Sequence, residues 1–507
     1  MSNRSRCSIV PDVPKRSLAL LAAGCLSLLA ACGYQSDATV IRVGYGSAPL
    51  TLDPRFASDA TSYRLTQLLF RSPVVTDQRY LAHPELTAWE MLDARTFRFH
   101  LPEDARFDDG SAIDADDFIA TLSSILDPAT ASPLRGPLSH VERLERRGAG
   151  AVDVHLARPD RLFPGRLSVG LLAGEALDGR ALQAAPFSGP FALAGEFRPD
   201  RLRLSRRSDG QVFEFLHVTD PTVRALKLVT GELDVAVGSM PPETLAWLDQ
   251  QHGVEVRRRP GAIITYLGIN LTDSALREPD IRRALALAID RDAIIKHLFA
   301  GGASKASAVL PPGHWALDAD LAAIDYDPGT AAALLAARGY DQDHPLQLSY
   351  KTTTDPFRLR MAAVLQDQLA RVGVRLSIES YDWGTFYADV KAGRFQLYSL
   401  SWVGITLPDI FRHAFHSDAV PPAGANRGRY HNDAADRLIE AAEVEPDRAR
   451  QAALYRRLQR LLLDDLPCVP LWYEHSVAAV RNDIAGFRLY ADGRLSSLRD
   501  VRRVSAE

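Results

Sequence analysis

The N-terminal segment is the feature that most constrains how this 507-residue chain can fold. An apolar stretch covers residues 18–31, and basic side chains precede it at Arg4, Arg6, Lys15 and Arg16. Those 14 apolar residues are too few to cross a bilayer as a helix, which takes about 20, but they suit the apolar core of a secretion signal. The sequence therefore predicts that residues 1–31 direct export and are removed, so the rest of the chain folds outside the cytoplasm.

The apolar stretch ends in Leu29-Ala30-Ala31-Cys32, which resembles the lipobox of bacterial lipoproteins. The resemblance implies that lipid is attached to the Cys32 sulfur and that the chain is cut just before this residue. We expect the protein on the periplasmic side of the cell envelope, anchored to the membrane only by this lipid. No later segment reaches the roughly 18 consecutive apolar residues typical of a membrane-spanning helix. A simple signal peptide is the alternative, and the choice between inner and outer membrane stays open.

Cysteine usage then limits how the exported chain can be stabilised. Of its four cysteines, Cys7 and Cys25 leave with the signal and Cys32 carries lipid, so Cys468 is left alone. No intramolecular disulfide is expected, and stability has to come from an apolar core. The length is ample for such a core, since it corresponds to about two to four domains or to one large two-lobed body.

Strand-like and helix-like patterns alternate along the chain, which predicts a mixed α/β fold. Residues 40–43 and 96–101 have the composition of strands, and Asp114 with Asp117 forms an N-cap pair ahead of a helix. Longer helices are expected where apolar residues recur at helical spacing, at residues 279–298, 357–372 and 449–463. Short β-like runs lie among these helices, at residues 262–269, 346–350, 375–378 and 397–400.

Charge and motif content argue against several classes of function. The net charge is −4 and the isoelectric point is near 6.4, which argues against an electrostatic binder of nucleic acids. The chain contains no G-x-x-x-x-G-K, H-E-x-x-H, C-x-x-C, G-x-S-x-G or S-x-x-K motif. We therefore expect no cofactor and no catalysis, although a catalytic triad assembled from distant segments leaves no such local motif.

One group of residues could hold a metal ion. Asp409, His413 and His416 recur at helical spacing, so one helix face could present three ligands. A polar helix face beside a loop explains the same spacing, and no fourth ligand is evident. We therefore keep His413 and His416 as secondary candidates and predict no metal site.

Short motifs follow one another in order along nearly the whole exported chain. They are Leu52-Asp53-Pro54, Glu85-Leu86-Thr87-Ala88-Trp89-Glu90, residues 96–101, Phe107-Asp108-Asp109-Gly110, Ala115-Asp116-Asp117, Gly189-Pro190-Phe191, Gly231-Glu232-Leu233-Asp234, Tyr266-Leu267-Gly268-Ile269-Asn270, Ile281-Arg282-Arg283-Ala284, Ala288-Ile289-Asp290, residues 331–340, and Gly424-Ala425-Asn426 with Tyr430, Asn432 and Asp436. Each motif is short and degenerate, but their joint order and spacing behind a lipobox are specific. In these features the chain resembles the peptide- and nickel-binding class of extracytoplasmic solute-binding proteins (family 5), the capture subunits of ABC importers.

The resemblance implies a periplasmic-binding-protein-like II fold, in which two α/β lobes joined by a hinge enclose a ligand in the cleft between them. Lobe 1 is expected at residues 38–268, behind a lipid-anchored linker at 32–37, and lobe 2 at residues 269–479. The chain then returns to lobe 1 over residues 480–507. The implied partners are a peptide or peptide-like solute and the transmembrane subunits of an ABC permease, and the protein itself is expected to be a monomer.

One departure from the family bears on the ligand. Members that bind free peptides usually place an aspartate shortly after a Trp-x-Gly sequence, where it pairs with the α-amine of the peptide. Here the sequence is Trp402-Val403-Gly404-Ile405, so Ile405 holds that position. Because a buried ammonium without a carboxylate costs several kcal/mol, either Asp409 substitutes from a shifted loop or the ligand has no free α-amine.

Three further functions remain open on the same sequence. The cleft could hold a non-peptide solute such as a metal chelate, or a modified peptide. The same fold could serve as an envelope chaperone or sensor. An exported hydrolase is the least favoured of these alternatives.

Four residues are predicted to bind the ligand. Tyr45 follows the first strand and Trp402 follows the strand at 397–400, and open α/β sheets present their ligand sites at such strand ends. We expect the two aromatic side chains to face each other across the lobe interface, with Asn426 and Asp409 nearest to the polar end of the ligand. The alternative for Trp402 is a place in the core of lobe 2.

Overall fold

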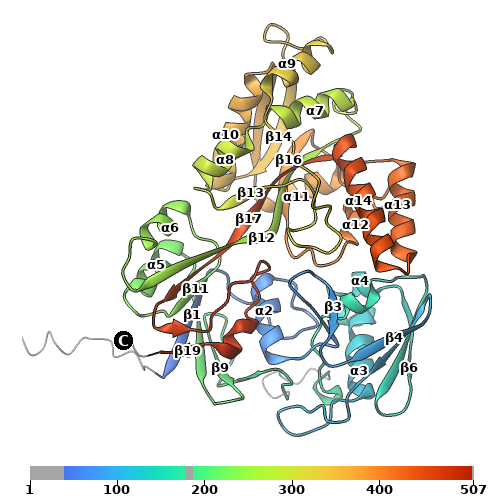
Figure 1. Ribbon diagram of the computed structural model, residues 1–507, viewed down its shortest axis with the longest axis vertical. Coiled ribbons are helices and arrows are strands. Elements are labelled where there is room, and N and C mark those ends of the chain that lie inside the picture. Colours follow the sequence, from blue (N-terminus) through green and yellow to red (C-terminus); the bar gives the residue numbers. More distant parts are fainter. Residues whose placement is uncertain (1–38, 178–185, 505–507) are drawn as a thin grey trace, which may run out of the picture. The chain divides into compact units, whose positions relative to one another are not determined.

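The computed structural model describes residues 39–177 and 186–504. The chain divides into two units, Met1–Val40 and Ile41–Glu507, and the second contains the folded body (Figure 1). The predicted signal peptide, the linker and the lipid site Cys32 lie outside the described residues. Among the described helices, none is long and apolar enough to span a membrane.

One large mixed sheet of 11 strands runs through the folded body. Its middle is formed by two long strands, β12 (Val254–Ile269) and β17 (Cys468–Arg481), which pair antiparallel (Figure 1). Beyond β17 follow β11, β1, β10, β9 and β8, and beyond β12 follow β16, β14 and β15, while β13 pairs with β17 outside this order. The bounds of these strands are β1 Val40–Tyr45, β8 Phe191–Leu193, β9 Arg201–Arg206, β10 Val212–His217, β11 Val235–Val237, β13 Ala303–Lys305, β14 Leu346–Thr353, β15 Val374–Tyr381 and β16 Leu397–Trp402.

Two lobes share the strand pair β12 and β17. Lobe 1 is built on β1 and β8–β11, and lobe 2 on β14–β16. The register of the shared pair shifts between Pro260 and Ile263, where a Cβ on Gly261 would lie 2.2 Å from the carbonyl oxygen of Glu474. Only glycine allows the two backbones to approach so closely, so the passage between the lobes is an irregular, tightly packed strand pair. The mixed α/β class is confirmed, and the exact lobe boundaries stay a prediction.

A smaller antiparallel sheet in lobe 1 carries the first strand-and-helix signal of the sequence. Helix α3 (Ala115–Leu126) packs on it through Phe118, whose ring lies 5.5 Å from that of Phe99. A capping box forms at its start, where the Asp117 carboxylate accepts from the Asp114 backbone N–H at 3.0 Å. The strand at 96–101 and the N-cap pair are thus confirmed. The strands of this sheet are β4 Ala88–Asp93, β5 Thr96–His100, β7 Ala151–Leu156 and β6 Val141–Arg146, and a separate hairpin joins β2 Val74–Thr76 to β3 Ala82–Pro84.

The single helix predicted at 279–298 is wrong. Two helices occupy this range, α7 (Pro279–Ala288) and α8 (Arg291–Leu298). The break falls at Ile289, whose backbone is extended, and at Asp290, whose carboxylate accepts a backbone N–H of the first turn of α8 at 2.8 Å. Apolar spacing continues through the break because both helices bury their apolar faces in the same core of lobe 2.

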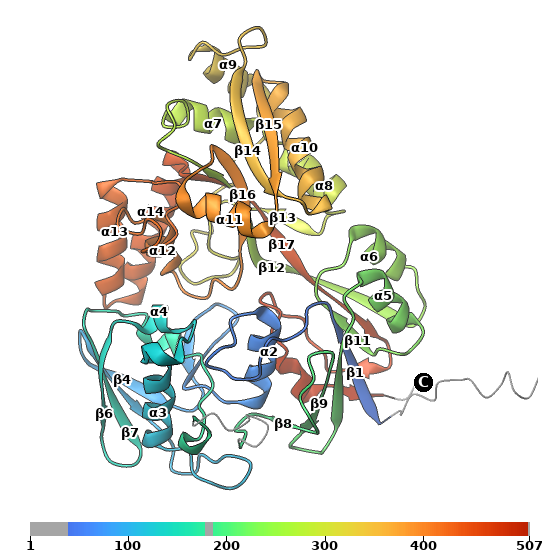
Figure 2. The ribbon, with the colours of Figure 1, turned by 180° about the vertical axis from the view of Figure 1, so that it is seen from behind.

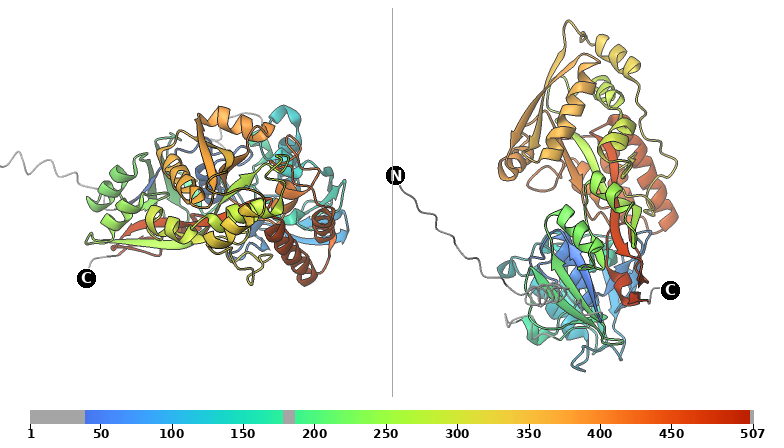
Figure 3. Two further views of the ribbon diagram at one scale, coloured as in Figure 1. Left: turned by 90° about the horizontal axis from the view of Figure 1, so that it is seen from above. Right: turned by 90° about the vertical axis from the view of Figure 1, so that its left-hand side faces the viewer.

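The other two predicted helices are confirmed as α10 (Pro356–Ala370) and α14 (Arg448–Asp465). Figure 2 shows α10 beside β14 and β15, and α14 beside α13 (Asp433–Val444). Figure 3 gives the same elements from two further sides. The remaining helices are α2 Ala60–Leu69, α4 Arg135–Leu138, α5 Pro221–Val229, α6 Pro242–Leu248, α9 Pro328–Ala336, α11 Trp383–Ala392 and α12 Ile410–Phe415.

Apolar packing links segments that are far apart in the sequence. In lobe 1, the buried side chains of Ile41 and Val43 share one core with Val480, Leu498 and Val501. The C-terminal segment therefore completes the core that β1 begins, while the predicted bounds of the return to lobe 1 stay a prediction. Within the described part of the chain the one cysteine has a free thiol.

Candidate functional site

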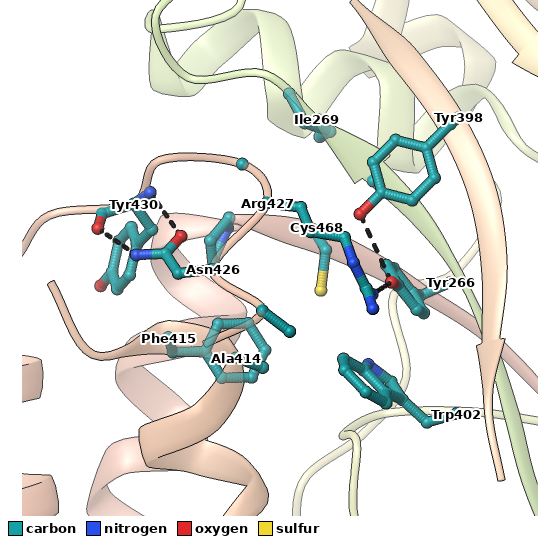
Figure 4. Close-up of a pocket in the computed structure, with 14 residues that line it drawn as sticks. Tyr266, Ile269, Tyr398, Trp402, Ala414, Phe415, Asn426, Arg427, Tyr430 and Cys468 are labelled. Carbon is teal, nitrogen blue, oxygen red and sulfur yellow. Dashed lines mark hydrogen bonds between the residues drawn. The ribbon is translucent and has the colours of Figure 1, made fainter. Parts of the chain in front are cut away.

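A pocket lies in lobe 2 where β12, β16 and β17 meet the loop at residues 425–430. About 350 Å³ there is free of atoms, part of it open to solvent, and aromatic and small side chains form most of the wall (Figure 4). No Asp or Glu belongs to the described lining. The residues labelled in Figure 4 are Tyr266, Ile269, Tyr398, Trp402, Ala414, Phe415, Asn426, Arg427, Tyr430 and Cys468.

Asn426 holds the loop that forms one wall of the pocket. Its side-chain amide donates to the carbonyl oxygens of His416 at 3.1 Å and Tyr430 at 2.7 Å, and its oxygen accepts from the Tyr430 N–H at 2.9 Å. Its neighbour Gly428 lies directly against β12, since a Cβ there would be 2.6 Å from the Ile269 carbonyl oxygen. Asn426 therefore sets the conformation of the loop, and its predicted contact with ligand stays a prediction.

The next residue, Arg427, reaches from this loop into the pocket. One terminal nitrogen donates to the Tyr266 hydroxyl at 2.8 Å and the other to the Tyr387 hydroxyl at 3.3 Å. The guanidinium carbon lies 4.8 Å from the ring centroid of Trp402 and 5.6 Å from that of Tyr387. Burial alone would lower the pKa of Arg427, but the surrounding phenol oxygens, including that of Tyr398, raise it above its usual value. The side chain thus stays charged, and none of the described carboxylates lies within 4.0 Å of it.

Trp402 belongs to a series of stacked groups around this guanidinium. Its half-buried ring lies parallel to that of Tyr266, with centroids 6.1 Å apart at 14°. Nearer the surface, Tyr387 stacks on Trp383, with ring centroids 5.4 Å apart and an interplanar angle of 6°. Trp383 is 56% exposed. The series therefore runs from the surface to the buried Tyr266. Trp402 and Asn426 line the same pocket, and their predicted role in ligand binding stays a prediction.

Tyr45 lies in a different environment, inside lobe 1. The side chain is buried, its hydroxyl donates to the Pro199 carbonyl oxygen at 3.1 Å, and its ring stacks on that of His217 at 5.8 Å. Burial, followed by the charge of Asp200, raises the pKa of Tyr45 above its usual value. Tyr45 does not line the pocket of Trp402, and the predicted pairing of the two residues stays a prediction.

Asp409 belongs to a partly buried ion-pair network rather than to the pocket. Its carboxylate lies 2.5 Å from Arg166, which follows β7 in lobe 1, and Arg166 also pairs with Asp160 at 2.7 Å. The Asp160 carboxylate has a second partner, since His140 Nε2 lies 3.0 Å from its Oδ2. Burial alone would raise the pKa of Asp160, but His140 and Arg166 hold it well below the usual range. The Asp409 carboxylate therefore already has a strong cationic partner.

The two secondary metal candidates do not converge. His413 lies edge-on to the Trp402 ring at 5.9 Å, whereas the buried His416 faces Glu440 at 3.4 Å. Within residues 39–177 and 186–504, groups of three ligand atoms close enough for a metal ion occur elsewhere. They are Glu145 with Asp153 and His155, and His431 with Asp433 and Asp436.

Sequence reasoning missed Arg427 and Tyr266 as pocket residues, and it missed Tyr387 as a hydrogen-bond partner of Arg427. A signal for Arg427 was present, because it directly follows the Gly424-Ala425-Asn426 motif. Tyr266 belongs to another recognised motif on β12. Tyr387 lies on α11, and nothing in the local sequence indicates that its hydroxyl reaches a residue 40 positions away.

Comparison with known proteins agrees with this architecture. The model of the bacterial extracellular solute-binding proteins, family 5 (middle part), matches residues 76–419. The di/tripeptide-binding protein 2 of Pseudomonas aeruginosa is 26% identical, with 95% of this chain and 98% of the relative covered. The glutathione-binding protein GsiB of Escherichia coli O1:K1 / APEC is 26% identical, with 92% of this chain and 94% of the relative covered.

Solved structures share the fold at low sequence identity. NikZ from Campylobacter jejuni, in complex with Ni(L-His), superposes with a TM-score of 0.76 at 20% identity, covering 92% of this chain and all (100%) of that one. The substrate-binding protein CtaP of an ABC transporter from Listeria monocytogenes gives a TM-score of 0.81 at 21% identity, with 93% and 100% covered. From the family match and this two-lobed α/β fold, the chain belongs to family 5 of the bacterial extracellular solute-binding proteins.

Proposed function

We propose that this protein is the lipid-anchored solute-binding subunit of an ABC importer, which captures peptides or peptide-like solutes between its lobes and delivers them to the permease. The family consists of extracytoplasmic solute-binding proteins rather than enzymes. The observation that carries the proposal is the pocket beside the shared strands β12 and β17, where aromatic rings surround a few fixed polar groups. Such a mixture suits a solute that is enclosed on all sides.

Peptides are the favoured solutes because relatives along most of the chain carry di/tripeptide-binding and glutathione-binding names. The pocket itself favours one kind of peptide. Ile405, at the position where family members usually have the amine-binding aspartate, is buried in an apolar cluster, and Asp409 is paired with Arg166. A free ammonium would lack a carboxylate partner here, which supports a solute whose α-amine is blocked or absent at this site.

Membrane attachment through Cys32 rests on the sequence Leu29-Ala30-Ala31-Cys32 behind a short apolar stretch. A Cys32→Ser variant is expected to appear as soluble or unprocessed protein, because no sulfur remains to be acylated. Fractionation of cells with metabolic labelling by a lipid precursor tests this. Acylated Cys32→Ser protein in the membrane fraction would contradict the lipid site.

Solute capture is tested on protein purified without refolding, by native mass spectrometry for a retained solute. Adding the released solute back to stripped protein is expected to raise the melting temperature by mass action and to reduce the radius of gyration in small-angle scattering. The solute should be recovered unchanged. Chemical turnover of the solute, or binding without a change in radius, would contradict capture by hinge closure.

A further inference from the structure

We propose that Arg427 binds a carboxylate of the captured solute, so that this pocket selects organic anions. This inference rests on the proposed function and specifies the chemistry of its ligand. The pocket presents one fixed positive charge, and its described lining contains no acidic side chain. A solute with an anionic end would supply the missing counter-charge on closure.

The partners of Arg427 distinguish it from the other buried arginines that lack an acidic partner. Arg224, Arg282 and Arg291 each donate to backbone carbonyl oxygens, which is how a structural guanidinium is satisfied inside a fold. Among residues 39–177 and 186–504, Arg427 has no such bond and donates only to two tyrosine hydroxyls. A guanidinium has five N–H donors, so most of its donor capacity remains available to a ligand.

Retaining such a group has a physical cost that a ligand would offset. Arg427 is 8% exposed, and a buried charge without a counter-charge is unfavourable even when rings partly compensate. The Trp402 ring at 4.8 Å compensates through its π-face and also limits how the side chain can turn. The guanidinium is therefore charged, partly desolvated and fixed in place before a solute arrives.

The geometry favours a carboxylate in particular. Trp402 and Tyr387 cover the guanidinium as ring neighbours, so a ligand is left the N–H edges. Two parallel N–H groups at such an edge match the two oxygens of a carboxylate. An ammonium group at the same place would be repelled by Arg427 and would find no acceptor carboxylate. The exposed Trp383, stacked on Tyr387, extends the apolar surface on which the remainder of the solute can lie.

The test uses four probes with matched shape and different charge: trialanine, trialanine amide and the N-acetylated form of each. Binding to the wild-type mature protein is measured by calorimetry. We expect the two acids to bind at least tenfold more tightly than their amides, and N-acetylation to cost little. Amides that bind as tightly as the acids would overturn the proposal.

Variants then assign the preference to Arg427. Arg427→Gln should lower affinity for the acids at least tenfold and bring the acid-to-amide ratio close to one. Arg427→Lys keeps the charge but loses the planar fork, so it should retain part of the ratio. Arg437→Gln removes an exposed arginine of α13 and should leave the ratio unchanged. An unchanged ratio in Arg427→Gln overturns the proposal.

A structural role for Arg427 would give a different result. Loss of a structural arginine lowers the melting temperature, whereas loss of a ligand-binding arginine should leave it unchanged or raise it. Where none of the four probes binds, the solute retained on purification decides: a solute without any acidic group overturns the carboxylate assignment and leaves solute capture intact. Absence of both probe binding and a retained solute would overturn the proposed function itself.

Discussion

Two buried arginines, Arg166 and Arg427, show opposite solutions to the same electrostatic problem. Arg166 lies between the carboxylates of Asp160 and Asp409 at 2.7 and 2.5 Å. Within the described part of the chain, Arg427 meets only hydroxyls and aromatic rings, although it too is largely removed from solvent. The difference indicates that the first arginine serves the fold and joins elements of both lobes, while the second keeps donors for a molecule that comes from outside.

Replacing Arg166 is expected to change the free energy of unfolding the most, and it tests whether the two arginines differ in role. Arg166→Met should lower the free energy of unfolding by about 3 kcal/mol, because the cation between Asp160 and Asp409 is lost and only Asp160 keeps a neighbour, His140 at 3.0 Å. Arg427→Met should change it by less than about 1 kcal/mol, because no partner charge is stranded. Urea unfolding of both variants measures the two values. Equal losses would show that the two arginines play the same role.

A smaller effect is expected at Asp409. Asp409→Asn should lower the free energy of unfolding by about 1–2 kcal/mol, because Arg166 keeps its pair with Asp160. Affinity for trialanine should stay within about twofold of the wild type. Calorimetry and urea unfolding on one preparation give both numbers. A tenfold loss of affinity with full stability would instead assign Asp409 to the amine end of a peptide.

Two tryptophans that each stack on an arginine sharpen the comparison further. Trp402→Phe should weaken binding of trialanine about tenfold, or about 1.4 kcal/mol, because Arg427 loses its best ring partner. The matched control is Trp315→Phe, since Arg448 lies 4.3 Å from the ring centroid of the buried Trp315. That control should lower the melting temperature and leave affinity unchanged. A lower melting temperature with unchanged affinity in Trp402→Phe would instead place Trp402 in the core of lobe 2.

Acid titration gives the smallest effect. The pKa of Asp160 is held below its usual value of 3.8, so its contribution to stability is complete above that value and is lost as the pH falls toward the native pKa. Between pH 5 and about 2 the wild type should therefore lose about 1 kcal/mol more stability than Asp160→Asn. Arg427→Gln should lose as much stability as the wild type over the same pH range. Thermal unfolding at several pH values measures these losses, and a matching change in Arg427→Gln would contradict the contrast.

Local signals in the sequence predicted the local structure well. The N-cap pair of Asp114 and Asp117 forms as expected, and β5 and α10 lie where their patterns indicate. The break between α7 and α8 was missed because buried Ile289 and Ile294 continue the apolar spacing on either side of Asp290, whose carboxylate caps a new helix. Helical periodicity reports which residues are buried. Two consecutive helices that pack into one core can therefore show one continuous pattern.

The site was predictable only in part. Trp402 and Asn426, which belong to a strand end and to a motif, line one pocket, while their predicted contact with a ligand stays a prediction. The pairing of Asp409 with Arg166 could not be read from the sequence, since 243 positions separate them and neither carries a periodic signal for the other. Arg427 was overlooked for a similar reason, because its partners come from β12 and α11, which meet its loop only in the folded protein.

The core that joins Ile41 and Val43 to Val480, Leu498 and Val501 has a consequence for the order in which the lobes can form. An exported chain crosses the membrane from its N-terminus, so β1 emerges more than four hundred residues before the segment that covers it. The core of lobe 2 also needs a late segment, since it includes Val469, Leu471 and Trp472 of β17. Lobe 1 has to wait longest, because Leu498 and Val501 cover Ile41 and Val43 only when the last part of the chain has crossed.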